Sequence, residues 1–253
     1  MADEKVLAIT GGASGIGLAI AGAALAEGWR VAVADRDEAA LERARGALDP
    51  ARSTLTALDV TDEAAVEGWI AGAAGPGRLA GAVSAAGIAA DVPALDTPVD
   101  LFRRILDVNV AGTFLLARAA GRAMRDSGEG GAILLIASVS GLRGAKGRAA
   151  YGASKAAVIN LAQVMAIDCA PHGIRVNALC PGPVETPLVA RVHTPEVRAQ
   201  WLRHVPMRRY AAPEEITPTA LFLLDGNKSG YLTGQAIAVD GGYAGAGLMP
   251  PSN

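Results

Sequence analysis

Residues 10–17 read TGGASGIG and lie between a short apolar run and an alanine-rich segment. The apolar run at 6–10 predicts a buried strand, and residues 15–27 predict a helix. Glycines in such a turn permit a tight bend, close approach of the backbone to a pyrophosphate, and close contact between helix and strand. The N–H groups that open the helix then face an anion. Such a turn can also be purely structural, but the strand before it and the helix after it are the context that phosphate binding requires.

The same alternation of strand and helix continues along the chain. Short apolar runs predict further strands at 31–35, 53–58, 81–85, 132–138, 174–179 and 235–239. Helices are predicted at 15–27, 38–48, 63–74, 99–125, 151–170 and 213–224. The strand runs are almost continuously apolar, which is typical of parallel sheets buried on both faces. The sequence therefore predicts an α/β fold with a doubly wound parallel sheet of seven strands and helices on both faces.

No linker or internal repeat divides the chain, so we expect residues 1–253 to form a single domain. The least regular region, at about 184–210, is expected to form a short helical lid over a site.

Composition and charge exclude several classes of function. The 253 residues carry a formal net charge of only −2, and no pattern of interleaved basic and aromatic residues suggests nucleic-acid binding. The longest strongly apolar run, 132–137, is far too short to span a membrane. Neither the two cysteines nor the three histidines have metal-ligand spacing. We therefore expect a soluble, cytoplasmic protein with no metal, no nucleic-acid partner and no membrane partner.

Asp35 is the main candidate for choosing the cofactor. It ends the second predicted strand, about 20 residues after the glycine turn, where an acid can hydrogen-bond the ribose hydroxyls of an adenosine. A 2′-phosphate at ~4 Å would be repelled by about 4 kcal/mol per unit charge. NAD is therefore expected over NADP, and Ser14 in place of a basic residue points the same way. Arg36 could instead receive the phosphate, and Asp35 could simply cap the next helix.

Tyr151 and Lys155 are the candidates for acid–base chemistry. In a helix, residues four apart lie on one face. A nearby ammonium can lower the pKa of a phenol from its ordinary value of about 10 by stabilising the phenolate. The pair would then move the proton of an alcohol or carbonyl. The alternative is a core tyrosine and a surface lysine at helical spacing.

Two further polar residues support the catalytic interpretation. Ser138 ends the apolar run ILLIAS, so its hydroxyl is expected at the carboxyl edge of the sheet, where open α/β sheets bind ligands. Asn109 lies inside a long apolar helix candidate, and its amide could hold a water that connects to Lys155.

Taken together, these features resemble the short-chain dehydrogenase/reductase family, in the form with the TGxxxGxG turn. The resemblance covers roughly residues 5–243 and includes TGGASGIG, the LDV segment at 58–60, YGASK at 151–155 and CPGPVETP from residue 180. It implies a single-domain Rossmann fold and hydride transfer to or from a nicotinamide. It also implies a tetrad of Asn109, Ser138, Tyr151 and Lys155. In that tetrad the tyrosine is the general acid/base, the lysine lowers its pKa and binds ribose, the serine orients substrate, and the asparagine supports a water relay.

The glycine turn and the resemblance together define the candidate cofactor site. Its members are Gly11, Ser14, Gly15, Ile16, Gly17, Asp35, Arg36, Asp59, Val60, Ala86, Gly87, Tyr151, Lys155, Pro181, Gly182, Val184 and Thr186. One departure from the family stands at VSAAG, residues 83–87, where an asparagine is usual at Ser84 or nearby. Since that asparagine mainly braces the sheet, we expect activity to survive its replacement.

The sequence says less about the substrate and about the oligomeric state. A small secondary alcohol, polyol or sugar is expected. The alternatives are a 3-oxoacyl thioester reductase, a non-catalytic nicotinamide-binding regulator, and an epimerase or dehydratase of the related extended family. Several cations could indicate an anionic substrate or form a solvated face: Arg143, Lys146, Arg148, Arg191, His193, Arg198, Arg203, His204, Arg208 and Arg209. The apolar helix at 151–168 needs cover on two sides, and the family resemblance suggests a homotetramer.

Overall fold

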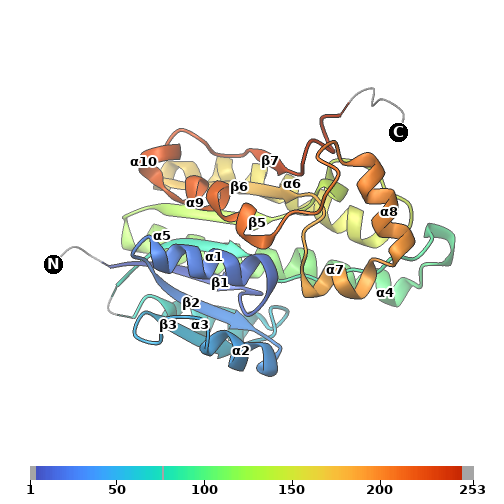
Figure 1. Ribbon diagram of the computed structural model, residues 1–253. Coiled ribbons are helices and arrows are strands. Elements are labelled where there is room, and N and C mark those ends of the chain that lie inside the picture. Colours follow the sequence, from blue (N-terminus) through green and yellow to red (C-terminus); the bar gives the residue numbers. More distant parts are fainter. Residues whose placement is uncertain (1–3, 76, 247–253) are drawn as a thin grey trace.

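A single parallel sheet forms the centre of the molecule in the computed structural model, which describes residues 4–75 and 77–246 (Figure 1). Its strands are β1 (Lys5–Thr10), β2 (Arg30–Asp35), β3 (Ser53–Ala57), β4 (Arg78–Ser84), β5 (Gly131–Ile136), β6 (Ile174–Pro181) and β7 (Ala236–Val239). They lie in the order β3-β2-β1-β4-β5-β6-β7, and every neighbouring pair is parallel. The predicted doubly wound, seven-stranded sheet is confirmed.

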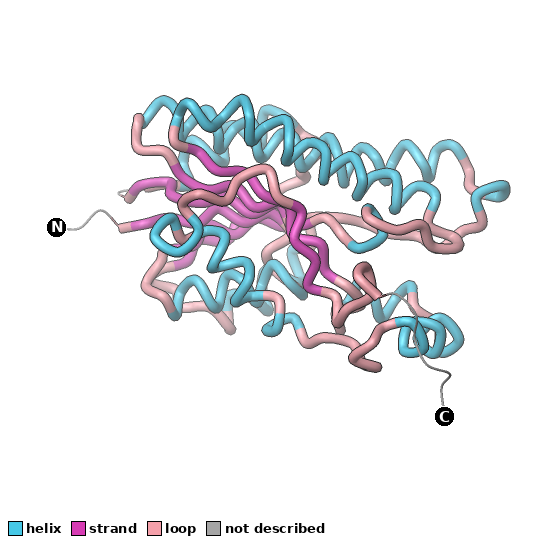
Figure 2. Tube along the Cα trace, turned by 90° about the horizontal axis from the view of Figure 1, so that it is seen from above, coloured by secondary structure: helices cyan, strands magenta, loops and turns pink. Residues whose placement is uncertain are grey.

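Helices cover both faces of this sheet (Figure 2). One face carries α1 (Gly15–Ala26), α2 (Glu38–Arg45) and α9 (Thr217–Leu224). The other carries α3 (Glu63–Ala73), α5 (Gly112–Ser127) and α6 (Ala149–Cys169), with α4 (Val99–Leu106) packed on α6. Two short helices, α7 (Pro187–Val192) and α8 (Pro195–His204), lie beyond the strand ends, and α10 (Gly226–Ser229) follows α9.

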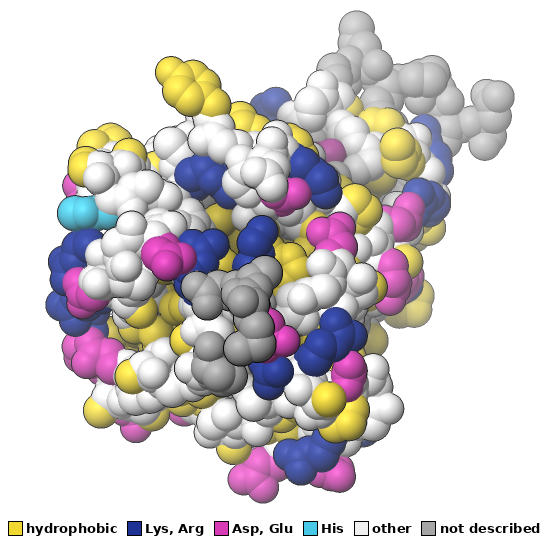
Figure 3. Space-filling view, turned by 90° about the vertical axis from the view of Figure 1, so that its left-hand side faces the viewer, with side chains coloured by type: hydrophobic (Ala, Val, Ile, Leu, Met, Phe, Trp, Pro, Cys, Tyr) yellow, Lys and Arg dark blue, Asp and Glu magenta, His cyan; other side chains and the backbone are white. Residues whose placement is uncertain are grey.

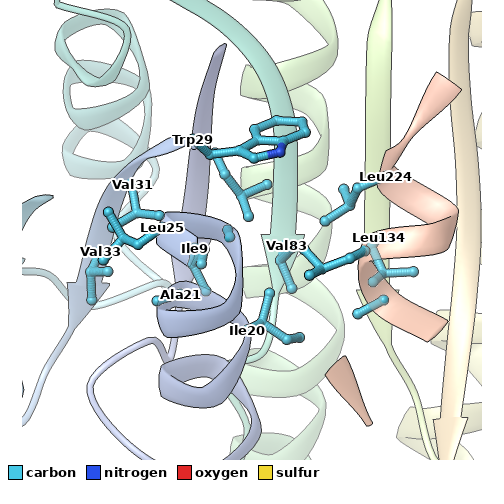
Figure 4. Close-up of a cluster of buried hydrophobic side chains, with 14 of the residues drawn as sticks. Ile9, Ile20, Ala21, Leu25, Trp29, Val31, Val33, Val83, Leu134 and Leu224 are labelled. Atoms are coloured by element: carbon cyan, nitrogen blue, oxygen red, sulfur yellow. The ribbon is translucent and has the colours of Figure 1, made fainter. Parts of the chain in front are cut away.

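The alternation of side chains along each strand divides the core into two layers. In β1, Leu7 and Ile9 join the layer beneath α1, while Ala8 between them joins the layer beneath α5 and α6. Figure 4 shows the first layer, where Ile20 of α1 lies near Val83 of the neighbouring strand β4. Because the side chains on both sides of each strand are buried, the strands appear in the sequence as continuous apolar runs.

Several predicted boundaries were wrong in detail. The helix predicted at 99–125 is divided by a π-helical turn, Asp107–Ala111, between α4 and α5. The helix predicted at 213–224 begins as a 3-10 turn, Pro213–Glu215, because Pro218 at the start of α9 gives no backbone N–H to a longer helix. The second helix ends at Arg45 rather than at 48. β5 ends at Ile136, so Ser138 follows the strand and opens the 3-10 turn Val139–Gly141.

Ser84 stands where the family resemblance led us to expect an asparagine, and it is braced by a neighbouring helix. Ser84 at the end of β4 is hydrogen-bonded to Thr113 of α5 through their hydroxyl oxygens, 2.8 Å apart and buried. This bond joins sheet and helix at the point where the sequence departs from the family pattern.

The strand order reverses between β1 and β4, and such a switch point opens a crevice at the carboxyl ends of the strands. In Figure 1 these ends lie on the side of α4, α7 and α8. The opposite edge, seen in Figure 3, carries acidic and basic side chains interspersed with one another. No helix in the described part of the chain combines the length and apolar character needed to cross a bilayer.

Candidate active site

A cleft of about 610 Å³ opens at the switch point. Its walls come from the glycine turn, the ends of β2 to β6 and the helix α7. Every residue predicted to bind the cofactor lines it, and so do Ser138, Tyr151 and Lys155. Asn109 is the one predicted site residue that does not belong to this lining.

The glycine turn is packed too closely for side chains. A Cβ at Gly17 would lie 2.2 Å from the carbonyl oxygen of Gly11, so α1 could not approach the end of β1 with any larger residue there. Gly15 adopts φ +52°, which side chains rarely tolerate, and its α-carbon faces Thr186 across the cleft. This bare backbone at a helix start fits the pyrophosphate of a dinucleotide.

Asp35 lies at the cleft and is bound to the glycine turn. One carboxylate oxygen accepts a hydrogen bond from the amide of Ala13 at 3.3 Å, and the other accepts from the amide of Asp37 at 3.2 Å. The helix cap of α2 is provided instead by Asp37, which accepts from the amide of Ala40 at 2.9 Å. The capping role considered for Asp35 therefore belongs to Asp37, two residues further along the chain.

The end of the cleft at Asp35 also contains cations. Arg36 and Arg43 line it beside Asp35, and Arg43 was not anticipated from the sequence. Asp59 lies there too, but its Oδ1 already accepts from the amide and hydroxyl of Thr61 at 2.9 and 2.8 Å. These bonds lower the pKa of Asp59 and fix its carboxylate in the ionised form.

At the other end of the cleft, α6 brings Tyr151 and Lys155 together, with Nζ 5.8 Å from the ring centroid. Lys155 is 5% exposed and donates from Nζ to the carbonyl of Ile136 at 2.8 Å. Burial lowers the pKa of Lys155 to about 8, so the ammonium remains the main form at neutral pH. Burial raises the pKa of Tyr151, against the lowering effects of a hydrogen bond with Ser138 and of the Arg148 cation. The phenol in the protein alone is therefore not yet the activated base that the Tyr151–Lys155 spacing suggested.

Ser138 reaches the cleft from the turn after β5. Its Oγ accepts from the amide of Ser140 at 3.1 Å, which fixes the side chain in a buried position. The hydrogen bond with Tyr151 then places hydroxyl and phenol side by side.

Asn109 lies behind the cleft, in the π-helical turn. Its Oδ1 accepts from the amide of Ile88 at 2.8 Å, and its Nδ2 donates to the carbonyl of Ile88 and to the hydroxyl of Ser154, each at 3.0 Å. Both amide N–H groups are thus used within the protein. The side chain holds the segment after Gly87 against α6, and only an oxygen lone pair remains for the predicted water.

Most of the basic residues considered for substrate binding have partners in the protein. Arg198 pairs with Glu185, and Arg209 with Glu215. Arg143 donates to the carbonyl of Ala244. Further donors bind backbone carbonyls: Arg203 that of Ala199, and Arg208 that of Arg203. Arg191 differs, because it lines the cleft and forms no ion pair with any described residue.

The structure adds lining residues that sequence reasoning missed. All but Asp37 are apolar or lie on α7: Asp37, Ala40, Leu58, Ala85, Ile88, Val108, Ile136, Ala137, Pro187, Leu188, Val189 and Ala190. Pro187 directly follows Thr186, whose hydroxyl accepts from the amide of Val189 at 3.2 Å and caps α7. The TP pair before an apolar run was the available signal for this helix. Within the described residues, no group of three or more His, Cys, Asp or Glu side chains is arranged to hold a metal ion.

Comparisons with known proteins show which proteins this chain resembles. A protein-family profile described as enoyl-(acyl carrier protein) reductase matches residues 11–244. The 2-(S)-hydroxypropyl-CoM dehydrogenase 3 of Xanthobacter autotrophicus is 41% identical over 94% of this chain and 96% of its own. The galactitol 2-dehydrogenase (L-tagatose-forming) of Cereibacter sphaeroides is 41% identical over 95% of each chain. The crystal structure of levodione reductase superposes with a TM-score of 0.90 at 30% identity, covering 96% of this chain and 98% of that one.

Proposed function

The chain belongs to the short-chain dehydrogenase/reductase family, as an NAD(P)-dependent oxidoreductase acting on CH–OH groups, and we propose that it interconverts a small secondary alcohol, polyol or sugar and its ketone with NAD. The observation that carries the proposal is one cleft with Asp35 at one end and Ser138, Tyr151 and Lys155 at the other. Relatives named as dehydrogenases of hydroxypropyl and galactitol compounds support the secondary alcohol.

Each of the three catalytic side chains has a distinct task in the proposal. Ser138 holds the substrate oxygen, and Tyr151 takes the hydroxyl proton as the C–H bond breaks. Lys155 stays fixed by the carbonyl of Ile136 and stabilises the phenolate by its charge. The chemistry that bound NAD supplies is acceptance of the hydride. In the reverse direction Tyr151 returns the proton to the ketone oxygen.

The choice of NAD rests on Asp35. Its carboxylate is held in place by the amides of Ala13 and Asp37 and would repel a 2′-phosphate. Arg36 and Arg43 stand nearby on the same wall, so the comparison of NAD with NADP is part of the test.

A second candidate is reduction of a 3-oxoacyl thioester, whose carriers bear phosphate groups. Arg191 favours it, because this cation lines the cleft and has no carboxylate partner among the described residues. Loss of activity toward the thioester alone in Arg191→Gln would support this candidate.

The proposal includes a homotetramer in the cytoplasm. Exposed apolar side chains on α6 (Val164 and Ile167) and α5 (Phe114) support contact with another subunit. The cysteines, Cys169 and Cys180, are both free thiols, in keeping with a reducing compartment.

The test is the appearance of reduced nicotinamide with NAD or NADP across a panel of alcohols, polyols and sugars. Tyr151→Phe should lower kcat by about 10³-fold or more, since proton transfer is lost. NADH binding, followed by fluorescence, should persist in this variant. The matched control is Tyr231→Phe, because Tyr231 is fully exposed. Full turnover by Tyr151→Phe would refute the assigned role.

A further inference from the structure

A second polar cluster lies directly beside the catalytic tyrosine and consists of Asp91, Arg148, His193 and Tyr210. Arg148 binds both carboxylate oxygens of Asp91, with Nε 2.7 Å from Oδ1 and Nη2 3.1 Å from Oδ2. The same Nη2 lies 2.7 Å from Nε2 of His193. On the far side of the imidazole, Nδ1 lies 2.9 Å from the hydroxyl of Tyr210. Arg148, His193 and Tyr210 are each less than one-tenth exposed, so water competes little for these bonds.

The donors and acceptors of this cluster settle the state of the imidazole. A guanidinium can only donate, so Nε2 of His193 accepts and carries no proton. Burial, with the nearby cations of Arg148 and Arg198, lowers the pKa of His193 to about 4, so the ring is neutral at physiological pH. The proton therefore resides on Nδ1, which donates to the oxygen of Tyr210.

Asp91, Arg148 and His193 come from three separate segments next to the cleft. Asp91 belongs to the segment after β4, and the backbone of its neighbour Val92 is paired with Arg148. Arg148 immediately precedes α6, the helix that carries Tyr151. His193 directly follows α7, whose residues from Pro187 to Arg191 line the cleft. Its ring also stacks on Trp201 of α8, with centroids 6.0 Å apart and the planes at 13°.

The cluster also acts on the phenol itself. The guanidinium carbon of Arg148 lies 5.3 Å from the ring centroid of Tyr151, slightly closer than Nζ of Lys155. Arg148 lowers the pKa of Tyr151, while the carboxylate of Asp91 raises it. Removing the arginine therefore changes both the electrostatics of the phenol and the support of α7.

We propose that Arg148 is a positioning residue of the active site. Through His193 it holds the α7–α8 segment over the cleft, and through its contact with the ring of Tyr151 it keeps that side chain aligned with the same segment. The proposal rests on the proposed function, because it concerns the same cleft. Its guanidinium is committed to Asp91 and His193, so Arg148 serves the substrate site indirectly rather than by binding an anionic substrate.

The experiment compares hydrogen exchange and steady-state kinetics in variants of the full chain. Amides of 187–204 should exchange about 10-fold faster in His193→Leu, Arg148→Gln and Asp91→Asn than in the wild type. The KM for the alcohol should rise about 10-fold in all of them. The pKa of Tyr151, read from the pH dependence of kcat/KM, should rise in Arg148→Gln. It should not rise in His193→Leu, because that variant retains the Arg148 cation. His193→Gln, which retains one acceptor and one donor, should recover part of the lost KM.

Two controls match the charge and chemistry of the cluster. Lys146→Gln removes an exposed cation two residues from Arg148, and His204→Leu removes the exposed histidine at the end of α8. Neither should change exchange or KM. If Arg148→Gln fails to fold, the double variant Asp91→Asn/Arg148→Gln removes both charges and leaves no unpaired carboxylate. It should show the same faster exchange.

Two results would overturn the proposal. One is wild-type exchange of 187–204 in His193→Leu. The other is a loss confined to Arg148→Gln and to anionic substrates, with Asp91→Asn unaffected, which would make Arg148 a substrate ligand. A wild type that oxidises no alcohol would defeat the proposed function, whereas the exchange experiment would still decide the role of the cluster.

Discussion

The carboxylate of Asp35 and the amide of Ala13 are joined by a 3.3 Å hydrogen bond across the mouth of the cleft. The bond links the end of β2 to the glycine turn, so the acid proposed to select the cofactor is fixed to the loop proposed to hold its phosphates. A ribose hydroxyl donating to Asp35 would thus meet a carboxylate that is already oriented.

Replacing this carboxylate should change cofactor preference. In Asp35→Asn, we expect the KM for NAD to rise about 10-fold and the KM for NADP to fall, because a repulsion of about 4 kcal/mol at ~4 Å is removed. Asp37→Ser is the comparison, since serine keeps the α2 cap but removes a nearby charge. If the KM values for NAD and NADP changed equally in both variants, the preference would depend on the overall negative charge at this end of the cleft and not on a specific contact with Asp35.

Lys155 should cost stability at neutral pH. Its pKa in the folded protein is about 8, below the ordinary 10.5, so the unfolded chain binds the proton more tightly between these values. Stability from this group therefore rises with pH across that window. Lys155→Met should be inactive yet more stable at pH 7 by about 1–3 kcal/mol, with the gain shrinking toward pH 10. Denaturant melts from pH 6 to 10 measure this, and a less stable variant at pH 7 would contradict it.

Two glycines of α1 should respond oppositely to alanine. In Gly17→Ala the new Cβ would lie 2.2 Å from the carbonyl of Gly11, so we expect loss of cofactor binding and severe destabilisation. Nothing lies within 4 Å of a Cβ at Gly22, which is exposed. Gly22→Ala should stabilise the protein by about 0.5–1 kcal/mol, through helix propensity alone. Thermal melts of the two variants provide the comparison, and similar melting temperatures would argue against it.

The exposed face of α6 should be an interface in solution. Ile167 is 76% exposed, and Val164, three residues earlier on the same helix, is exposed as well. Exposed apolar side chains that are grouped on one face mark an interaction surface. We expect Ile167→Glu to reduce the proposed tetramer to smaller species in sedimentation experiments, while Glu42→Gln on α2, on the other face of the sheet, leaves it intact. A wild type that sediments as a monomer would remove the basis for this prediction.

The sequence predicted the sheet, the glycine turn and the Tyr151–Lys155 pair because these depend on local periodicity and short spacings. The π-helical turn at Asn109 was missed, because the hydrophobic pattern runs through it without a break. The partners of Arg148 were missed for another reason. Asp91 and His193 lie 57 and 45 residues away in the chain, and only the folded chain brings them to the guanidinium.

The strand order has a consequence for how the chain is made. β1 lies between β2 and β4, and its pairing with β4 joins Lys5 to Arg78. Until β4 leaves the ribosome, the nascent chain therefore has only β1 to β3, with the apolar inner edge of β1 open to other chains. Pairing β4 with β1 is a long-range step, which slows folding. It therefore lengthens the time during which the edge of β1 is exposed. An interior strand of the finished sheet, β1, is thus the aggregation-prone edge of the growing one.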